Sequence, residues 1–184
     1  MMAIDTPYGQ LNSQLFEQLS TIKLLACDVD GVFSDGRIYM GQNGEELKAF
    51  HTRDGYGVKA LLNVGIHVVV ITGRRSKMVE NRMTALGVTH ILQGCEDKQP
   101  ALEALQKELS ITADETVAIG DDMPDLGMFN TAKLNVCVND GHPLVANKAH
   151  YVTRTKGGFG AVREICDLIL LTKGQLTNIH GASV

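Results

Sequence analysis

The stretch that decides the fold is LLACDVDGVFSDG, residues 24–36, in which an apolar run ends abruptly at two acidic residues. The run before Asp28 is short and apolar, which is typical of a buried strand in a parallel sheet. Asp28 and Asp30 are separated by a single valine, and two carboxylates at that spacing repel each other. Packing gives no reason for either acid at the end of a buried strand. We therefore expect them to take part in chemistry that supplies a compensating positive charge.

Short apolar segments like this one recur along the chain between helical patterns. The predicted strands are KLLACDV (23–29), HVVVIT (67–72), HILQG (90–94), TVAIG (116–120) and LNVCV (134–138), with a weaker sixth at AHYVT (149–153). The predicted helices cover residues 55–64, 76–86, 98–109, 122–131, 143–148 and 159–171. This alternation predicts an α/β fold, a Rossmann-like open parallel sheet with helices on both faces.

One segment, GRIYMGQNGEELKAFHT (36–52), interrupts the alternation. Strand-like stretches flank Asn43-Gly44, a dipeptide that favours a tight turn, so we expect an inserted β-hairpin after the first strand. An isolated hairpin is only marginally stable in water. Its apolar side chains therefore need a partner, and we expect hairpins of other subunits to supply it in a homo-oligomer. The alternative is a hairpin folded back on its own domain. The apolar residues concerned are Ile38, Met40, Leu47 and Phe50.

Length and charge restrict the class of protein. With 184 residues and a formal net charge of −4, the chain is expected to form one domain over 1–184, without a general attraction to nucleic acid or to anionic membranes. No apolar run approaches the roughly 20 residues that a membrane-spanning helix needs. The N-terminus lacks the basic start and apolar core of a secretory signal. We therefore expect a cytoplasmic protein.

The four cysteines show no metal-ligand spacing. Cys27, Cys137 and Cys166 have apolar neighbours and are expected in the core, whereas Cys95 lies in a loop that could be exposed. Cys27 adjoins Asp28, but on an alternating strand it points to the opposite face. That orientation argues against a nucleophilic role for this thiol.

Polar side chains follow the predicted strands at the edge where an open parallel sheet binds its ligands. Carboxylates, one hydroxyl and a lysine are therefore expected to converge on one rim of the sheet. The segments are Asp28-Val29-Asp30-Gly31 after the first strand, Thr72-Gly73-Arg74-Arg75 at the second, Asp97-Lys98 after the third, and Gly120-Asp121-Asp122-Met123-Pro124-Asp125 at the fourth.

A cluster of acids of this kind requires a hard cation such as Mg²⁺, which completes its coordination with a substrate phosphate. Phosphate in turn is bound by hydroxyl, backbone N–H and ammonium donors, here Thr72, the Gly73 turn and Lys98. Asp28, held ionised, can attack phosphorus, and Asp30 on the same face can protonate the leaving alkoxide and then deprotonate water. The pattern predicts Mg²⁺-dependent hydrolysis of a phosphomonoester through an aspartyl phosphate.

These residues resemble the haloacid dehalogenase superfamily of phosphatases, and the resemblance extends from Asp28 to about Lys173. It implies that Asp28 is the nucleophile and Asp30 the acid/base. It also implies a Mg²⁺ site formed by Asp28, the backbone carbonyl of Asp30, and Asp121.

The same resemblance assigns the residues around the phosphoryl group. Thr72 and Lys98 are expected to hold that group. Asp122 and Asp125 are expected to support the metal through water or to orient Lys98.

Longer stretches are similar to one subfamily, the phosphatases of 3-deoxy-D-manno-octulosonate (KDO) 8-phosphate in lipopolysaccharide biosynthesis. The resemblance implies a tetramer built by the hairpin, in which a neighbouring subunit closes each site, and no separate cap domain. No insertion here is long enough to form a cap. The tail at about 173–184 is expected to be flexible, either visiting a neighbouring site or simply disordered. The stretches are CDVDGVFSDGRIY, FHTRDGYGVKAL, ITGRRSKMVENRMTALGV, QGCEDK, IGDDMPDL and KGGFGAVREICDLIL.

The substrate is expected to be a phosphorylated keto sugar. The carboxylate of a 2-keto acid favours recognition by guanidinium groups, for which Arg74 and Arg82 are the candidates. In related phosphatases of nine-carbon keto sugar 9-phosphates, the position matching Arg74 resembles a glutamate, so arginine favours the eight-carbon acid. The alternatives are a nine-carbon substrate and two arginines that merely pair with surface acids.

Proteins with two other functions have most of these residue types at their sites. A receiver-like signalling domain also surrounds a phosphorylated aspartate with acids, Mg²⁺, a threonine and a lysine, but it lacks an acid two residues after the acceptor. A phosphomutase or phosphotransferase of the same superfamily would move phosphate to a second sugar hydroxyl instead of water. Release of free phosphate distinguishes the phosphatase from both.

Overall fold

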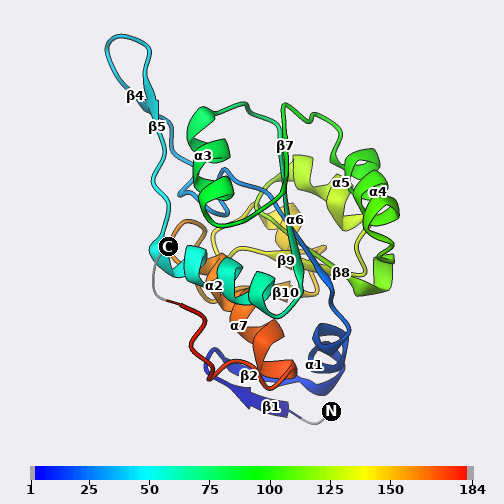
Figure 1. Ribbon diagram of the computed structural model, residues 1–184. Coiled ribbons are helices and arrows are strands. Elements are labelled where there is room, and N and C mark those ends of the chain that lie inside the picture. Colours follow the sequence, from blue (N-terminus) through cyan, green and yellow to red (C-terminus); the bar gives the residue numbers. More distant parts are fainter. Residues whose placement is uncertain (1–2, 182–184) are drawn as a thin grey trace.

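The computed structural model describes residues 3–181, and its centre is a six-stranded sheet in which all neighbouring strands are parallel (Figure 1). The strand order is β10-β9-β8-β3-β6-β7, so β3, which precedes Asp28, lies between β8 and β6. The predicted fold class is confirmed, and every predicted strand is present with ends within two residues of those expected. The strands are β3 Leu24–Cys27, β6 His67–Thr72, β7 His90–Gln93, β8 Thr116–Gly120, β9 Leu134–Cys137 and β10 Tyr151–Val152.

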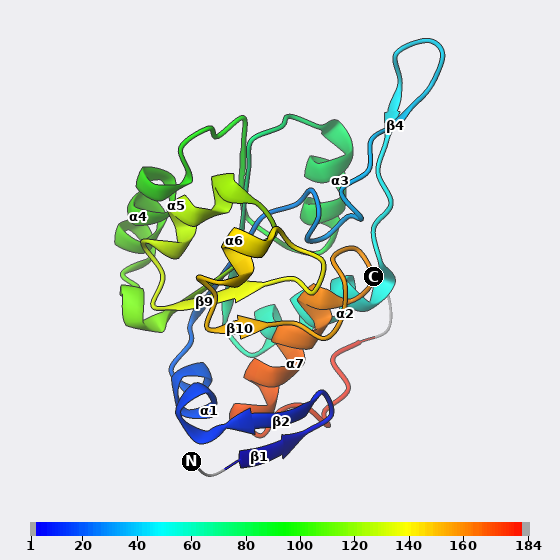
Figure 2. The same cartoon turned by 180° about the vertical axis from the view of Figure 1, so that it is seen from behind.

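Helices cover both faces of the sheet, as the alternation predicts (Figures 1 and 2). Successive strand residues face opposite sides, and two separate clusters of buried side chains result. One includes side chains of α1, α2, α3 and α7, and the other those of α4, α5 and α6. The helices are α1 Ser13–Ser20, α2 Thr52–Asn63, α3 Lys77–Ala85, α4 Lys98–Leu109, α5 Leu126–Phe129, α6 Pro143–Ala146 and α7 Ala161–Thr172.

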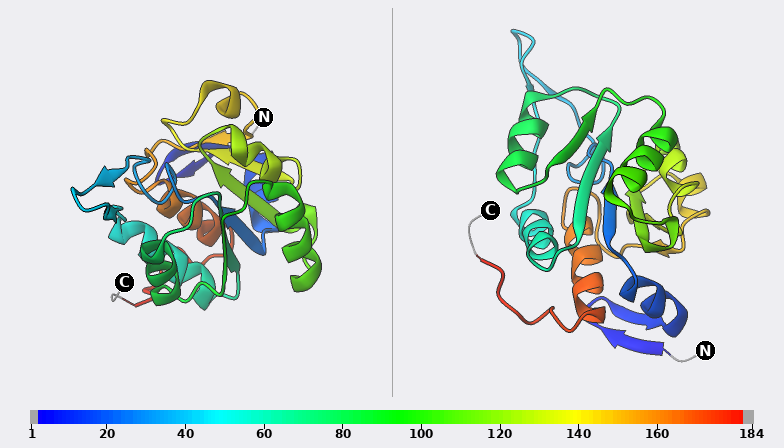
Figure 3. Two further views of the ribbon diagram at one scale, coloured as in Figure 1. Left: turned by 90° about the horizontal axis from the view of Figure 1, so that it is seen from above. Right: turned by 45° about the vertical axis from the view of Figure 1, so that its right-hand side comes forward.

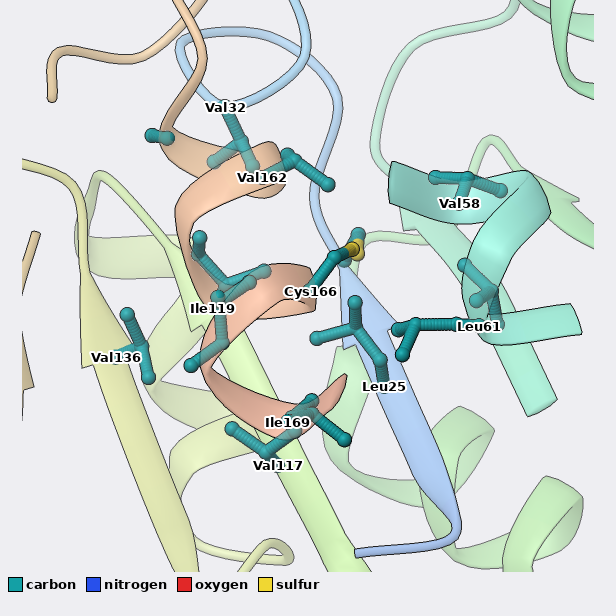
Figure 4. Packing of buried hydrophobic residues seen from close by; sticks show 14 of the residues in the cluster. Leu25, Val32, Val58, Leu61, Val117, Ile119, Val136, Val162, Cys166 and Ile169 are labelled. Atoms are coloured by element: carbon teal, nitrogen blue, oxygen red, sulfur yellow. The ribbon is translucent and has the colours of Figure 1, made fainter. Parts of the chain in front are cut away.

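Helix α7 lies against the middle of the sheet and against α2. Its side chains meet Leu25 of β3 and Ile119 of β8 on one side and Val58 of α2 on the other (Figure 4). The two helices approach closely at Gly57, where an added Cβ would lie 2.9 Å from Cβ of Cys166. The predicted core positions of three cysteines are confirmed, since Cys27, Cys137 and Cys166 are all fully buried.

The helix expected at 122–131 is divided. A 3₁₀ turn, η2 Met123–Asp125, precedes the four residues of α5. The side chain of Asp122 accepts a hydrogen bond from the N–H of Met123, and proline stands in the first turn. The shorter turn brings Asp125 back toward the end of β8.

Two N-terminal strands precede the sheet and were not predicted from the sequence. They are β1 Ala3–Thr6 and β2 Gly9–Asn12, which form an antiparallel hairpin, and α1 follows. Leu15 and Leu19 of α1 are buried, and the hydroxyl of Tyr8 donates to Oδ2 of Asp167 in α7 at 2.7 Å. This segment therefore packs on α7.

The inserted hairpin is present within the expected segment 36–52, as β4 Tyr39–Met40 and β5 Glu46–Leu47. Its tip projects away from the sheet, at the opposite end of the molecule from β1 and β2 (Figures 1 and 3).

None of the described helices has the length and apolar character needed to cross a membrane.

The predicted tail, about 173–184, is described as far as Gly181, and its last three residues lie outside the described part. The described part returns along α2. The N–H of His180 donates to the hydroxyl of Tyr56 at 3.1 Å, and Asn63 donates to the carbonyl of His180 at 3.0 Å. Its predicted flexibility stays a prediction.

Candidate active site

A cavity of about 490 Å³ opens at the carboxyl ends of β3, β6 and β8, where the sequence predicts a site. All strand-end residues expected to carry the chemistry line it, together with Glu96 and Cys95 from the loop after β7. The predicted residues in its wall are Asp28, Asp30, Thr72, Gly73, Arg74, Lys98, Asp121, Asp122 and Asp125.

Lys98 joins two acids at the floor of this cavity. Asp97 caps α4 by accepting from the N–H of Gln99, which puts Lys98 in the first turn. The Lys98 ammonium donates to Asp28 Oδ1 at 2.6 Å and to Asp125 Oδ1 at 2.7 Å. All three side chains are buried. Burial acts to lower the pKa of Lys98, but the two carboxylates outweigh it and raise that pKa, so the lysine stays charged.

Asp125 organises the loop after β8. Its Oδ2 accepts from the backbone N–H groups of Asp121 at 2.8 Å and Asp122 at 3.1 Å, while its Oδ1 is held by Lys98. Both oxygens of Asp125 therefore have partners within the protein. The arrangement fits the expected role of orienting Lys98.

The negative charges of Asp28 and Asp121 are not fully balanced by Lys98. Burial, followed by the charge of Asp125, raises the pKa of Asp28 to about 7 despite Lys98. Burial and the neighbouring acids, Asp28 first among them, raise the pKa of Asp121 to about 8. Ligand oxygens of Asp28, Asp121 and Asp125 lie within 4.8 Å of one another. The single ammonium of Lys98 therefore does not balance the negative charge of these carboxylates. A small divalent cation could be held between Asp28 and Asp121.

The chain at Gly31 approaches Asp121 directly. Gly31 has φ +86°, and an added Cβ would lie 2.1 Å from Oδ2 of Asp121. Only glycine tolerates both the positive φ and the lack of space. This contact brings the backbone after Asp30 beside the acid that the sequence predicts as a metal ligand.

Asp30 has a partner that the sequence did not indicate. The ammonium of Lys48, which follows β5 in the hairpin, contacts Oδ1 of Asp30 and lies 3.3 Å from Oε1 of Glu46. Glu46 in turn accepts from Arg74 at 2.6 Å. Alternating charges thus connect the base of the hairpin to two predicted site residues.

Two further predicted substrate contacts lie in different surroundings. Thr72 is buried at the end of β6 and is one of the residues that line the cavity. Arg82 lies in α3 and is not among the described residues that line the cavity. Its charge instead helps to lower the pKa of Asp54, against the larger effect of burial. Its expected contact with substrate stays a prediction.

A second loop, residues 153–160, packs against the loop after β3. An added Cβ at Gly157 would lie 1.7 Å from the carbonyl oxygen of Gly31, and Gly158 donates to the carbonyl of Val32 at 2.9 Å. Buried Glu164 holds this loop by accepting from both the N–H and the hydroxyl of Thr155. No sequence pattern indicates this role, because the contacts depend on how the loop returns to the sheet.

The sequence of the chain is similar to those of known hydrolases. The model of the haloacid dehalogenase-like hydrolase family matches residues 90–165. A 3-deoxy-D-manno-octulosonate 8-phosphate phosphatase from Yersinia pestis is 50% identical over 181 residues, which cover 98% of this chain and 97% of the relative. The chain belongs to the haloacid dehalogenase-like hydrolase family.

Solved structures of similar proteins have closely similar folds. The crystal structure of the Yersinia pestis phosphatase has a TM-score of 0.96 and 50% identity, covering 100% of this chain and 99% of the other. A phosphatase of the same name from Moraxella catarrhalis, solved with a magnesium ion, a phosphate ion and KDO, has a TM-score of 0.87 and 42% identity. That match covers 90% of this hydrolase and 95% of the other chain.

Proposed function

We propose that this hydrolase is a Mg²⁺-dependent phosphatase that converts KDO 8-phosphate to KDO and phosphate. The observation that carries the proposal is the buried set of Asp28, Lys98 and Asp125 beside Asp121 in one cavity. The near full-length similarity of the chain to phosphatases named for KDO 8-phosphate supports the proposed substrate.

In the first step, a carboxylate oxygen of Asp28 attacks phosphorus. The bond between phosphorus and the ester oxygen breaks, and that oxygen takes the proton of the Asp30 carboxyl group. In the second step, water attacks phosphorus, its proton passes to Asp30, and the bond to Asp28 breaks to release phosphate. Lys98 and Thr72 bind the phosphoryl oxygens in both steps.

The metal expected for this chemistry is Mg²⁺, held by the carboxylates of Asp28 and Asp121 and by the backbone carbonyl of Asp30. When bound, it supplies positive charge that offsets the acids and the charge of the transferring phosphoryl group. The raised pKa values of Asp28 and Asp121 support a cation at this position.

Substrate recognition is proposed to involve residues beside the phosphate-binding group. Arg74 at the cavity wall is proposed to bind the carboxylate of the sugar acid, the Gly73 turn is proposed to bind phosphate, and Arg82 is proposed to reach the substrate from α3. A tetramer formed through the hairpin, a cytoplasmic location and a role in lipopolysaccharide biosynthesis remain predictions from the sequence.

The test is release of free phosphate from a panel of KDO 8-phosphate, a nine-carbon keto sugar 9-phosphate and a simple hexose 6-phosphate. We expect turnover with Mg²⁺, its loss with EDTA, recovery on adding Mg²⁺, and the highest kcat/KM for KDO 8-phosphate. Faster turnover of the nine-carbon substrate would replace the proposed substrate. A stable, stoichiometric phosphoprotein without turnover would indicate a signalling domain, and phosphate moved to a second sugar hydroxyl would indicate a mutase.

A further inference from the structure

The base of the inserted hairpin places one lysine side chain beneath the rim of the cavity. In an extended strand, residues two apart share a face, so Glu46 and Lys48 face one way and Leu47 the other. Leu47 is 61% exposed, whereas the side chain of Lys48 is only 1% exposed. A buried ammonium group is costly unless it is paired. Its two partners are the carboxylates of Asp30 and Glu46.

The position of Lys48 limits what it can do. Asp30 lines the cavity, but Lys48 is not among the described residues that do so. The lysine therefore lies behind Asp30 relative to the substrate, and it is not a direct ligand of the phosphoryl group. It contacts Oδ1 of Asp30, which leaves Oδ2 as the oxygen free to exchange a proton with substrate.

We propose that Lys48 is a positioning residue, which fixes the Asp30 carboxyl group for proton transfer to the leaving oxygen. This inference rests on the proposed function, because it assigns a cause to the orientation of the proposed acid/base. The hairpin thereby acts on the chemistry of its own subunit.

A second contact of the same strand supports this assignment. Glu46 accepts from Arg74 at 2.6 Å and lies 3.3 Å from the Lys48 ammonium. One strand end thus contacts both the proposed acid/base and the proposed ligand of the sugar acid. A hairpin that served only as a surface for other subunits would not need to bury the Lys48 side chain in an ion pair with Asp30.

The experiment separates protonation of the leaving group from the rest of catalysis. The sugar alkoxide of KDO 8-phosphate needs a proton to leave, whereas p-nitrophenolate leaves without one. In single turnovers, Lys48→Met should slow release of KDO by on the order of 10- to 100-fold, a part of what general acid catalysis contributes. Release of p-nitrophenolate from p-nitrophenyl phosphate should stay within about threefold of the wild type. The KM for KDO 8-phosphate should change little.

Two single variants serve as controls, and a double variant tests whether Lys48 acts through Asp30. Lys48→Arg keeps the charge and the hydrogen-bond donors, and it should recover most of the lost rate even if Lys48→Met folds poorly. Lys23→Met removes a lysine just before β3 whose ammonium lies 2.6 Å from Oε1 of Glu115, and this variant should behave as the wild type. Adding Lys48→Met to Asp30→Asn should cause no further loss, since the lysine acts through Asp30.

The outcomes are distinct. Equal losses with both substrates, no loss with KDO 8-phosphate, or no recovery in Lys48→Arg would each overturn the role of Lys48 and leave the proposed function standing. A wild-type protein that releases phosphate from neither substrate would overturn the proposed function, and this inference with it.

Discussion

Asp28 and Lys98 form the contact on which the proposed chemistry depends. Their charged atoms lie 2.6 Å apart in a buried setting, where burial and the charge of Asp125 raise the pKa of Asp28 and favour its protonated form. Lys98 opposes this by stabilising the ionised form, and Asp125 keeps the lysine in place from the other side. A carboxylate must be ionised to attack phosphorus. The lysine and the proposed cation therefore act together to keep Asp28 reactive.

Asp28→Asn tests the nucleophile. An amide has almost the same shape but does not attack phosphorus, so we expect kcat for KDO 8-phosphate to fall by at least about 10³-fold. Phosphate release in stopped assays measures this loss. Asp114→Asn, at an exposed surface carboxylate, is the matched control and should keep wild-type activity. A rate within tenfold of the wild type in Asp28→Asn would mean that another group attacks.

At the residue scale, the location of the site residues was easier to predict from the sequence than the contacts between their side chains. Asp28, Thr72 and Lys98 were predicted to converge because parallel strands end at one edge of the sheet, and chain order alone determines which residues follow them. Lys48 was not predicted. Its contact with Asp30 depends on the path of an inserted hairpin, which no local pattern determines. The only available signal was the alternation of Glu46, Leu47 and Lys48.

At the scale of elements, the contact between α2 and α7 contains a buried acid. Asp54, in the first turn of α2, accepts from the N–H of Arg163 in α7 at 2.8 Å, and its Oδ2 has no hydrogen-bond partner among the described residues. Burial raises the pKa of Asp54 to about 7, although the N–H and charge of Arg163 act to lower it. The folded carboxyl group is therefore protonated at pH values where the unfolded one is ionised.

This difference makes the stability of the helix pair depend on pH. Below about pH 4 both states are protonated, and as pH rises toward 7 the unfolded state loses its proton first. The folded state then holds more protons, so the free energy of unfolding falls over this range. Since one pKa unit corresponds to about 1.4 kcal/mol, the loss is on the order of a few kcal/mol.

Asp54→Asn removes this titration and should lose less stability between pH 5 and pH 8 than the wild type. Urea unfolding at pH 5 and pH 8 measures the difference. A change in the free energy of unfolding that the substitution causes equally at both pH values cancels in this comparison. The exposed variant Asp114→Asn should follow the wild type. Equal losses in Asp54→Asn and the wild type would show that Asp54 does not titrate in this range.

Regular elements were predictable where one local pattern dominates. The bounds of β6, β8 and α4 agree with those predicted, because the two strands are continuous apolar runs between polar residues and Asp97 caps the helix. The N-terminal hairpin and α1 were missed. Residues 3–12 mix polar and apolar side chains without a clear period, and their structure depends on packing against α7, a contact between segments far apart in the sequence.

At the scale of the whole molecule, the hairpin carries two different sets of side chains. Glu46 and Lys48 form ion pairs with Arg74 and Asp30, whereas apolar side chains on the same two strands are exposed to water. The hairpin itself projects from the domain (Figure 1). An apolar surface on so small an element is stable when a partner covers it. Its exposed apolar residues, with exposed fractions, are Ile38 49%, Tyr39 42%, Met40 76% and Leu47 61%.

Met40→Asp tests assembly through the exposed apolar side chains of the hairpin. Covering one such side chain contributes about 1.5–3 kcal/mol, and each 1.4 kcal/mol changes an equilibrium constant tenfold. A buried carboxylate at four symmetry-related positions should therefore dissociate a tetramer at micromolar concentration, as measured by size-exclusion chromatography with light scattering. Leu144→Asp, at a leucine of α6 that is 54% exposed, should leave the mass unchanged.

Activity distinguishes assembly from catalysis in the same samples. If a neighbouring subunit closes each site, dissociated Met40→Asp should have a raised KM for KDO 8-phosphate, while release of p-nitrophenolate from a small substrate changes less. The contact between Lys48 and Asp30 lies within one subunit and should survive dissociation, so the leaving-group preference should stay that of the wild type. A monomeric wild type, or an unchanged mass in Met40→Asp, would show that the apolar side chains of the hairpin do not assemble the protein.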